Sequence, residues 1–131
     1  MNILNKEKQL ASLKTAPKFV AEGKITFEID GKTTEATDVI IQDSPDNSLV
    51  GLMGADIVIV QFPTLTKPGT YNLKDEKHVW IYISLNGVPW DAETGSLTLE
   101  IIEMRSSYKG SFDFKTKDHR KVDGTFNVRR I

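Results

Sequence analysis

The chain contains no cysteine, which excludes disulfide bonds, thiolate nucleophiles and sulfur-ligated metals together. Histidine is also scarce, with two residues in 131. His78 opens an apolar run and His119 lies among charged residues, and neither has a second histidine or a nucleophile at a recognisable spacing. We therefore expect no catalytic histidine, no metal and no cofactor.

Long hydrophobic runs are absent as well. No window approaches the roughly 18 apolar residues that a membrane-spanning helix needs, and the first ten residues lack the apolar centre of a secretory signal. The sequence therefore predicts no membrane span. It predicts a cytoplasmic protein by default, or an exported one if a leader has been removed.

Charge of one sign is not in excess, because 17 basic and 18 acidic residues give a net charge of -1. The distribution is uneven: residues 105–131 hold eight basic and three acidic residues, whereas residues 1–104 hold nine basic and fifteen acidic ones. We interpret this asymmetry as surface charge on two attracting halves of one fold, with a polyanion-binding surface as the alternative. Nucleic acid is not an expected partner.

Helical spacing is confined to residues 3–14. Ile3, Glu7, Leu10 and then Leu13 or Lys14 recur at intervals of three or four, and Pro17 prevents continuation. We divide the chain into an N-terminal helix and linker over residues 1–17 and a single β domain over residues 18–131. The thin apolar stripe favours a helix that covers the β core or stays frayed.

Beyond Pro17 the hydrophobic period changes to two. Ile25, Phe27 and Ile29 alternate with polar residues and stop at a tight Asp-Gly turn, whereas residues 57–62 are apolar on both faces and belong between layers. Turn signals recur about every ten residues. The sequence thus predicts an all-β fold, an antiparallel β-sandwich or flattened barrel of about eight to ten strands with one short N-terminal helix.

Asn86 and Gly87 stand between two β-prone runs and predict a type I′ hairpin. Pro89 places the second strand at a sheet edge or a bulge. Counting outward from the turn gives the expected register: Leu85 opposite Val88, Ile83 opposite Trp90, Tyr82 opposite Asp91 and Trp80 opposite Glu93.

This register places Trp80 and Tyr82 on one face with two acids, Asp91 and Glu93, as neighbours. Acidic neighbours are unusual for a buried core, so we predict an exposed aromatic face that could stack a sugar, a flat ligand or a partner's side chain. The alternative is that the N-terminal helix or another sheet covers these rings.

Two carboxylate pairs share a face and could in principle hydrolyse a glycoside: Glu28 with Asp30, and Asp91 with Glu93. Both pairs adjoin turns, where acids are ordinarily solvated. The oxygens of residues 43–47 could ligate calcium, but the longer ligand pattern of a dedicated site is missing, and we interpret this stretch as a turn.

A weak repeat recurs in which glycine is followed after one residue by a large apolar side chain. Its copies begin at Gly23, Gly95, Gly110 and Gly124, and we interpret each glycine as the opening of a strand. With Gly69 and Tyr71, the second half of the chain resembles an uncharacterised family of small β-sandwich domains found mostly in bacterial lipoproteins. The resemblance implies a fold and no known activity, and we expect this chain to depart from the family in having no lipoprotein leader.

These observations favour a non-enzymatic binding or adaptor domain that recognises a protein or a saccharide through Trp80, Tyr82, Asp91 and Glu93. Two alternatives remain: a barrel enclosing a small apolar ligand, suggested by the doubly apolar residues 57–62, and a hydrolase using paired carboxylates.

Overall fold

The structure, a computed structural model, describes residues 19–42, 46–64, 66–103 and 106–131. These residues are all-β and form eleven strands, one more than the upper end of the expected range. The strands are β1 (Phe19–Ile29), β2 (Lys32–Ala36), β3 (Asp38–Gln42), β4 (Asn47–Met53), β5 (Asp56–Phe62), β6 (Gly69–Asn72), β7 (Trp80–Leu85), β8 (Val88–Asp91), β9 (Thr94–Glu103), β10 (Ser107–Lys115) and β11 (Lys121–Arg130).

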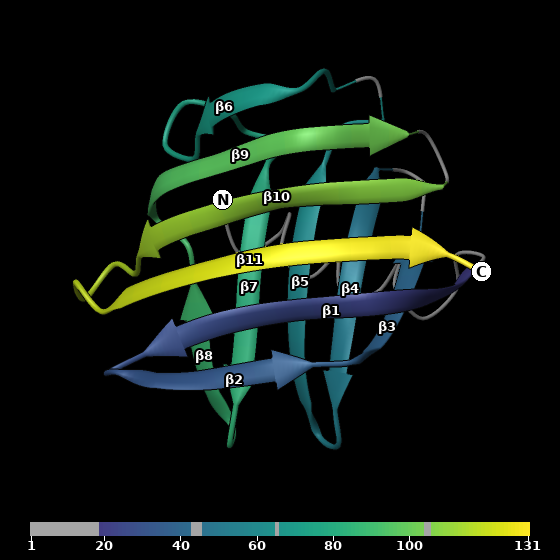
Figure 1. Ribbon diagram of the computed structural model, residues 1–131. Helices are drawn as coiled ribbons and strands as arrows, with labels where there is room; N and C mark the ends of the chain where they lie inside the picture. Colours follow the sequence, from purple (N-terminus) through teal and green to yellow (C-terminus); the bar gives the residue numbers. More distant parts are fainter. Residues whose placement is uncertain (1–18, 43–45, 65, 104–105) are drawn as a thin grey trace.

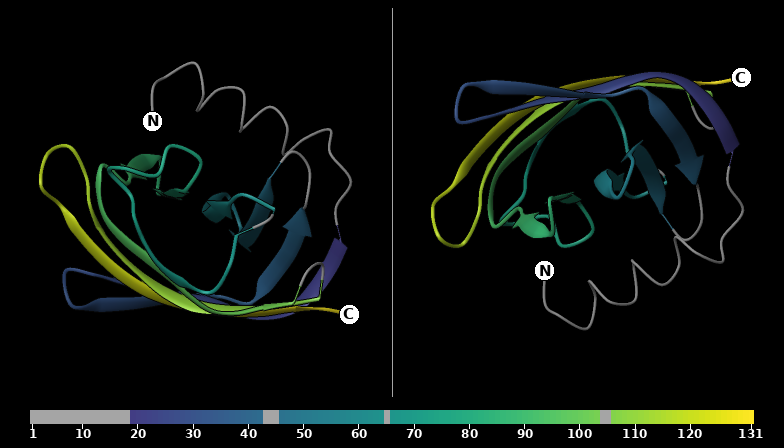
Figure 2. Two further views of the ribbon diagram at one scale, coloured as in Figure 1. Left: turned by 90° about the horizontal axis from the view of Figure 1, so that it is seen from above. Right: turned by 90° about the horizontal axis from the view of Figure 1, so that it is seen from below.

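The strands pair antiparallel in one continuous sheet with the order β6-β9-β10-β11-β1-β3-β4-β5-β7-β8, and β2 pairs with β1. The sheet curls into a half-barrel whose two layers cross (Figures 1 and 2). We call β1, β2, β6, β9, β10 and β11 the front layer and β3, β4, β5, β7 and β8 the back layer. The expected all-β architecture of packed antiparallel layers is confirmed at this level.

β1 joins the two layers. Most of its length pairs with β11, but Phe19 and Val20 pair with Ile41 and Ile40 of β3, so one strand leads from the front layer into the back layer. The core fills the space between the layers. The predicted alternation along β1 is confirmed, because Ile25 and Phe27 are 0% and 1% exposed.

β5 is buried on both faces, as its sequence predicts. Val58, Val60 and Phe62 belong to the core between the layers, whereas Ile57 and Ile59 belong to a second apolar cluster on the opposite side of the back layer. The fold therefore has an apolar surface that faces away from the main core.

Gly95 is the second residue of β9, as the interpretation of the repeated glycines as strand openings predicts, but that interpretation is wrong for Gly23, Gly110 and Gly124, which lie inside β1, β10 and β11. In β10 and β11 each glycine faces a phenylalanine of the other strand: Gly110 opposite Phe126 and Gly124 opposite Phe112. A Cβ atom on Gly124 would lie 2.2 Å from Cζ of Phe112. The two motifs are thus reciprocal, since each glycine makes room for the ring contributed by its neighbour.

The β7–β8 hairpin has the predicted register for its four inner pairs, from Leu85 opposite Val88 to Tyr82 opposite Asp91. Asn86 and Gly87 have positive φ angles of 52° and 79°, which a type I′ turn requires. The Asn86 backbone N–H donates to Oδ1 of Asp56 at 2.8 Å and fastens the turn to β5. β8 is the last strand of the sheet order, which confirms the edge position expected from Pro89.

The helix predicted over residues 3–14 lies outside the described residues, as do residues 43–45 of the predicted turn. Within the described ranges, no helix has the length and hydrophobicity to cross a membrane.

Candidate functional site

The outer side of the back layer, turned away from the front layer, carries a continuous apolar cluster. Val50, Ile59 and Trp80 are 2%, 0% and 2% exposed, and half-buried residues surround them. We call this cluster the back face; its members are Ile40, Val50, Leu52, Ile57, Ile59, Trp80 and Tyr82.

The strand registers assemble the back face from four strands. Ile40 lies opposite Val50, Val50 opposite Ile59, and Ile59 opposite Tyr82, so these four side chains form one row across β3, β4, β5 and β7. With strands about 4.8 Å apart, the row is about 14 Å long. Asp91 of β8 continues the row beyond Tyr82.

A polar row runs beside the apolar one. Gln42 lies opposite Ser48, Ser48 opposite Gln61, and Gln61 opposite Trp80. We call Gln42, Ser48 and Gln61 the amide row; they are only 1%, 5% and 1% exposed. The Ser48 hydroxyl donates to Oε1 of Gln61 at 3.3 Å, as a buried polar group requires a partner.

Asp46 closes the amide row at the start of β4. Nε2 of Gln61 donates to its carboxylate oxygen Oδ2 at 3.4 Å. Partial burial raises the pKa of the Asp46 carboxyl above its ordinary value of 3.8, and the proximity of His78 and the Gln61 hydrogen bond oppose that shift. His78 therefore lies near one carboxylate, and the described residues contain no group of three histidine or acidic side chains that could hold a metal ion.

Trp80 is not exposed, contrary to the prediction. Its ring is buried and stacks on Tyr82, with centroids 5.4 Å apart and an interplanar angle of 24°. The indole Nε1–H donates to Oδ1 of Asp91 at 2.8 Å. The acid next to the aromatic pair therefore satisfies a buried donor, and its presence is compatible with a covered ring.

Glu93 lies apart from the other three residues of the predicted face. The Ala92 N–H still donates to the Ile81 carbonyl at 3.1 Å, but the Glu93 N–H donates to the carbonyl of Lys115 in β10 at 2.9 Å. The chain thus leaves β7 before Glu93 could face Trp80. The structure brings together Trp80, Tyr82 and Asp91.

The structure separates the two acids of the carboxylate pair predicted at the end of β1, Glu28 and Asp30. Asp30 lies in the β1–β2 turn with a φ of 52°, whereas Glu28 lies opposite Asp123, which in turn lies opposite Asp113. Glu28, Asp123 and Asp113 form an acidic row, exposed on the outside of the front layer. Sequence reasoning missed this row because its members come from three strands whose mutual register is not visible in the sequence.

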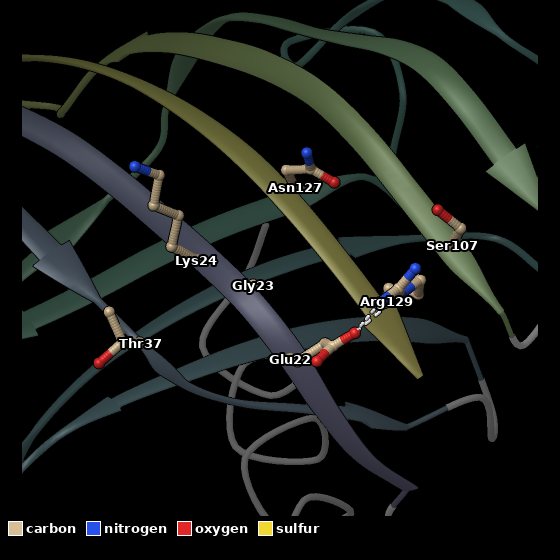
Figure 3. A pocket seen from close by; sticks show the side chains of 7 residues that line it. All are labelled: Glu22, Gly23, Lys24, Thr37, Ser107, Asn127 and Arg129. Atoms are coloured by element: carbon tan, nitrogen blue, oxygen red, sulfur yellow. Dashed lines mark hydrogen bonds and ion pairs between the residues drawn. The ribbon is translucent and has the colours of Figure 1, made fainter. Parts of the chain in front are cut away.

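A hollow on the outside of the front layer measures about 660 Å³ (Figure 3). Its lining comprises Glu22, Gly23, Lys24, Thr37, Ser107, Asn127 and Arg129. Arg129 pairs with Glu22, and Nζ of Lys24 lies 3.1 Å from the Glu35 carboxylate. Since both cations already have acidic partners, this hollow is poorly suited to an anion.

The basic C-terminal segment is also partly neutralised by the fold. Arg129 pairs with Glu22, and Nζ of Lys109 lies 3.9 Å from Glu100, so cations of residues 105–131 meet acids of residues 1–104. These pairs support the interpretation of the charge asymmetry as attraction within one fold. His119, the second histidine, is exposed in the loop between β10 and β11.

No family model matches the chain, and neither the curated proteins nor the solved structures contain a significant match. The resemblance to lipoprotein β-sandwich domains stays a prediction.

Proposed function

We propose that the protein is a non-enzymatic binding domain that docks a polypeptide segment on the back face. The observation that carries this proposal is a set of half-buried apolar residues, Ile40, Leu52, Ile57 and Tyr82, which lie around the buried Val50, Ile59 and Trp80 on the side of the sheet that faces away from the core. A contiguous apolar surface outside the main core is typical of an interaction site.

The chemistry of the back face favours a polypeptide over a saccharide. A sugar stacks on an accessible aromatic face, but Trp80 is 2% exposed and its N–H is already bonded to Asp91. The half-buried members, Leu52 and Ile57 among them, are mostly aliphatic and suit the apolar side chains of an amphipathic segment.

The two alternative functions have less support. A ligand inside the half-barrel would have to share space with Val58, Val60 and Phe62, each 0% exposed within the core. A hydrolase would need a free carboxylate at its site, whereas Asp91 accepts the indole hydrogen bond. Neither alternative has a specific observation in its favour.

A peptide library displayed on phage and selected on the immobilised full chain would test the proposal. We expect selected peptides to carry spaced apolar residues and to bind at least about tenfold more weakly to Ile57→Asp, which places a charge on the back face. The control is Thr125→Asp, which makes a comparable change on the exposed outside of the front layer.

Selected peptides that bind both variants with equal affinity would contradict a docking role for the back face. Binding of glycans from an array, lost in Tyr82→Ala, would identify a saccharide as the partner instead.

A further inference from the structure

β2 forms a free edge of the front layer. Among the described strands it pairs only with β1, so the front layer ends at β2 on this side. Its five residues, Lys32–Ala36, contain no proline, and their pairing with β1 has no register shift. Proline and bulges are two of the features with which edge strands prevent further pairing, and β2 has neither.

The turn before β2 sets the direction of its backbone groups. The Asp30-Gly31 turn has φ angles of 52° and 78°, and Ile29 and Lys32 lie opposite each other as the pair that closes it. The pair that closes such a two-residue turn exchanges hydrogen bonds, and alternate residues of a strand direct their N–H and C=O groups to opposite sides. The backbone groups of Thr33 and Glu35 therefore point away from β1, towards the free edge.

The back layer extends past this edge. Figure 1 shows the β4–β5 turn and the β7–β8 turn beyond β2. Met53 near the first turn and Leu85 near the second pack against the main core but are only half-buried, and Val88, which lies opposite Leu85, is 45% exposed. We call Met53, Leu85 and Val88 the apolar shelf. The shelf lies on the inner side of the back layer, where one more strand of the front layer would cover it.

The outer side of β2 borders a hollow that suits a basic side chain. The hollow measures about 240 Å³, and its lining includes Glu28 and Asp123 of the acidic row together with Thr33 of β2. Thr33 lies opposite Glu28, so the acidic row leads to the free edge. A residue placed opposite Thr33 on an added strand would lie about 10 Å from Glu28, two strand spacings away. A lysine or arginine at that position can reach over the short Thr33 side chain and relieve the repulsion within the acidic row.

We propose that an extended segment of a partner protein adds to β2 as a further strand of the front layer. Its backbone pairs with the edge at Thr33 and Glu35, and its apolar residues at alternate positions cover the apolar shelf. A basic residue on its other face lies beside Glu28. This site is on the opposite side of the back layer from the back face and does not depend on the proposed function.

A second copy of the chain fits the edge less well than a separate segment does. Two β2 strands in one continuous sheet would lie about 4.8 Å apart, whereas each back layer extends past its own β2, so the two back layers would meet before the strands could pair (Figure 1). The inner side chains of β2 are also small, since they include Thr34 and Ala36. They would leave much of the apolar shelf uncovered.

A peptide library displayed on phage and selected on the immobilised Ile57→Asp full chain tests strand addition, because this variant disfavours binding to the back face. We expect peptides with apolar residues at alternate positions and a lysine or arginine between them. Adding Val88→Asp to this background places a charge on the apolar shelf and should weaken their binding at least about tenfold. The matched control, Ile101→Asp, changes a residue that is 41% exposed on β9 and should leave binding unchanged. Equal affinity for both variants would overturn the proposal.

A second measurement uses the parent chain and does not require any variant to fold. Methylation of alternate backbone nitrogens in a selected peptide removes the N–H groups along one edge of its strand. We expect one of the two alternate patterns to weaken binding at least tenfold and the other, on the edge that faces away from β2, to change it by less than about twofold. In NMR titrations the amide resonances of Thr33 and Glu35 should shift. The same loss with both patterns would contradict strand addition.

Sedimentation and a second selection distinguish the possible occupants. We expect the parent chain to be a monomer, and a dimer that Thr33→Pro converts to a monomer would identify a second copy at β2 and overturn the proposal. A selection on Ile57→Asp that enriches no alternating sequence would overturn strand addition and leave the proposed function standing. Peptides selected on the parent that lose affinity for Val88→Asp and not for Ile57→Asp would support strand addition and contradict docking on the back face.

Discussion

Phe112 and Phe126 each lie over a glycine of the neighbouring strand, and this exchange explains why small and large residues alternate in both motifs. A methyl group at Gly124 would meet the Phe112 ring at 2.2 Å. We therefore expect Gly124→Ala to lower the free energy of unfolding by about 1–3 kcal/mol through overpacking.

Urea unfolding would measure this effect, with Thr125→Ala as the neighbouring control, expected to change stability by less than about 0.5 kcal/mol. Adding Phe112→Leu to Gly124→Ala should recover part of the loss, because the two positions are coupled. Strict additivity of the two substitutions would contradict the reciprocal packing.

The hydrogen bond between Trp80 and Asp91 predicts a second residue-scale effect. Asp91→Ala removes the acceptor of the buried indole N–H, and we expect a loss of about 1–3 kcal/mol in the free energy of unfolding. In Trp80→Phe, which has no N–H to satisfy, the same Asp91→Ala change should cost less. A double-mutant cycle by urea unfolding measures the coupling, and a coupling energy near zero would contradict this role for Asp91.

Asp46 predicts a pH dependence. Its folded-state pKa lies above the ordinary 3.8, so the folded protein holds this proton more tightly than the unfolded chain. This group therefore adds stability as the pH falls through its raised folded pKa, and the gain is complete below 3.8. At neutral pH we expect Asp46→Asn to be slightly more stable than the parent, by a few tenths of a kcal/mol because the carboxyl is partly exposed.

Thermal melts between pH 7 and pH 4 would measure the difference between the two proteins. The advantage of Asp46→Asn should shrink as the pH falls. An advantage that grows on acidification would mean that folding lowers the pKa of this carboxyl instead of raising it.

At the scale of the elements, the acidic row of the front layer places like charges directly opposite one another on β1, β11 and β10. Directly opposed like charges destabilise a sheet, so we expect Asp123→Asn to raise the free energy of unfolding by about 0.2–1 kcal/mol, and by less at high salt. Asp38→Asn on β3, which lies opposite Leu52, is the control and should have little effect. A gain that does not depend on salt would point away from charge repulsion.

The elements that the sequence predicted well are those set by local chemistry. The alternation of Ile25 and Phe27 and the Asn86-Gly87 turn fix their strands and their hairpin register within a few residues, and both are confirmed. The pairing of β1 with β11 joins residues about a hundred positions apart and has no local signal. The acidic row follows from that pairing, which is why it was missed.

The candidate site was also predicted only where it depends on local sequence, and not where it depends on the pairing of distant strands. Trp80, Tyr82 and Asp91 come together because one hairpin supplies all three. Trp80 also packs with Val50 of β4 and Ile59 of β5, and counting within the hairpin gives no sign of these contacts. Glu93 lies outside the site because its backbone N–H donates to β10 instead of continuing the hairpin. Extrapolating the hairpin register outward from the turn cannot predict this contact.

At the scale of the whole molecule, β1 belongs to both layers and the core between them is shared. We therefore expect the two layers to unfold together. Amide hydrogen exchange should give the same opening free energy for the slowest amides of β11 in the front layer and β5 in the back layer. Ile25→Ala in β1 should lower both equally, and a lowering confined to β11 would contradict a single cooperative unit.

Among the described strands the sheet of the half-barrel does not close, so β6 and β8 are its two terminal strands, and terminal strands are where a second molecule could pair with the backbone. β6 and β8 are only four residues long, and Pro89 in β8 has no N–H to offer an incoming strand. Edge-to-edge pairing of copies into fibrils would therefore form few backbone hydrogen bonds at either terminal strand of the sheet. The same short, interrupted borders therefore disfavour pairing of two copies of the chain through their sheet edges.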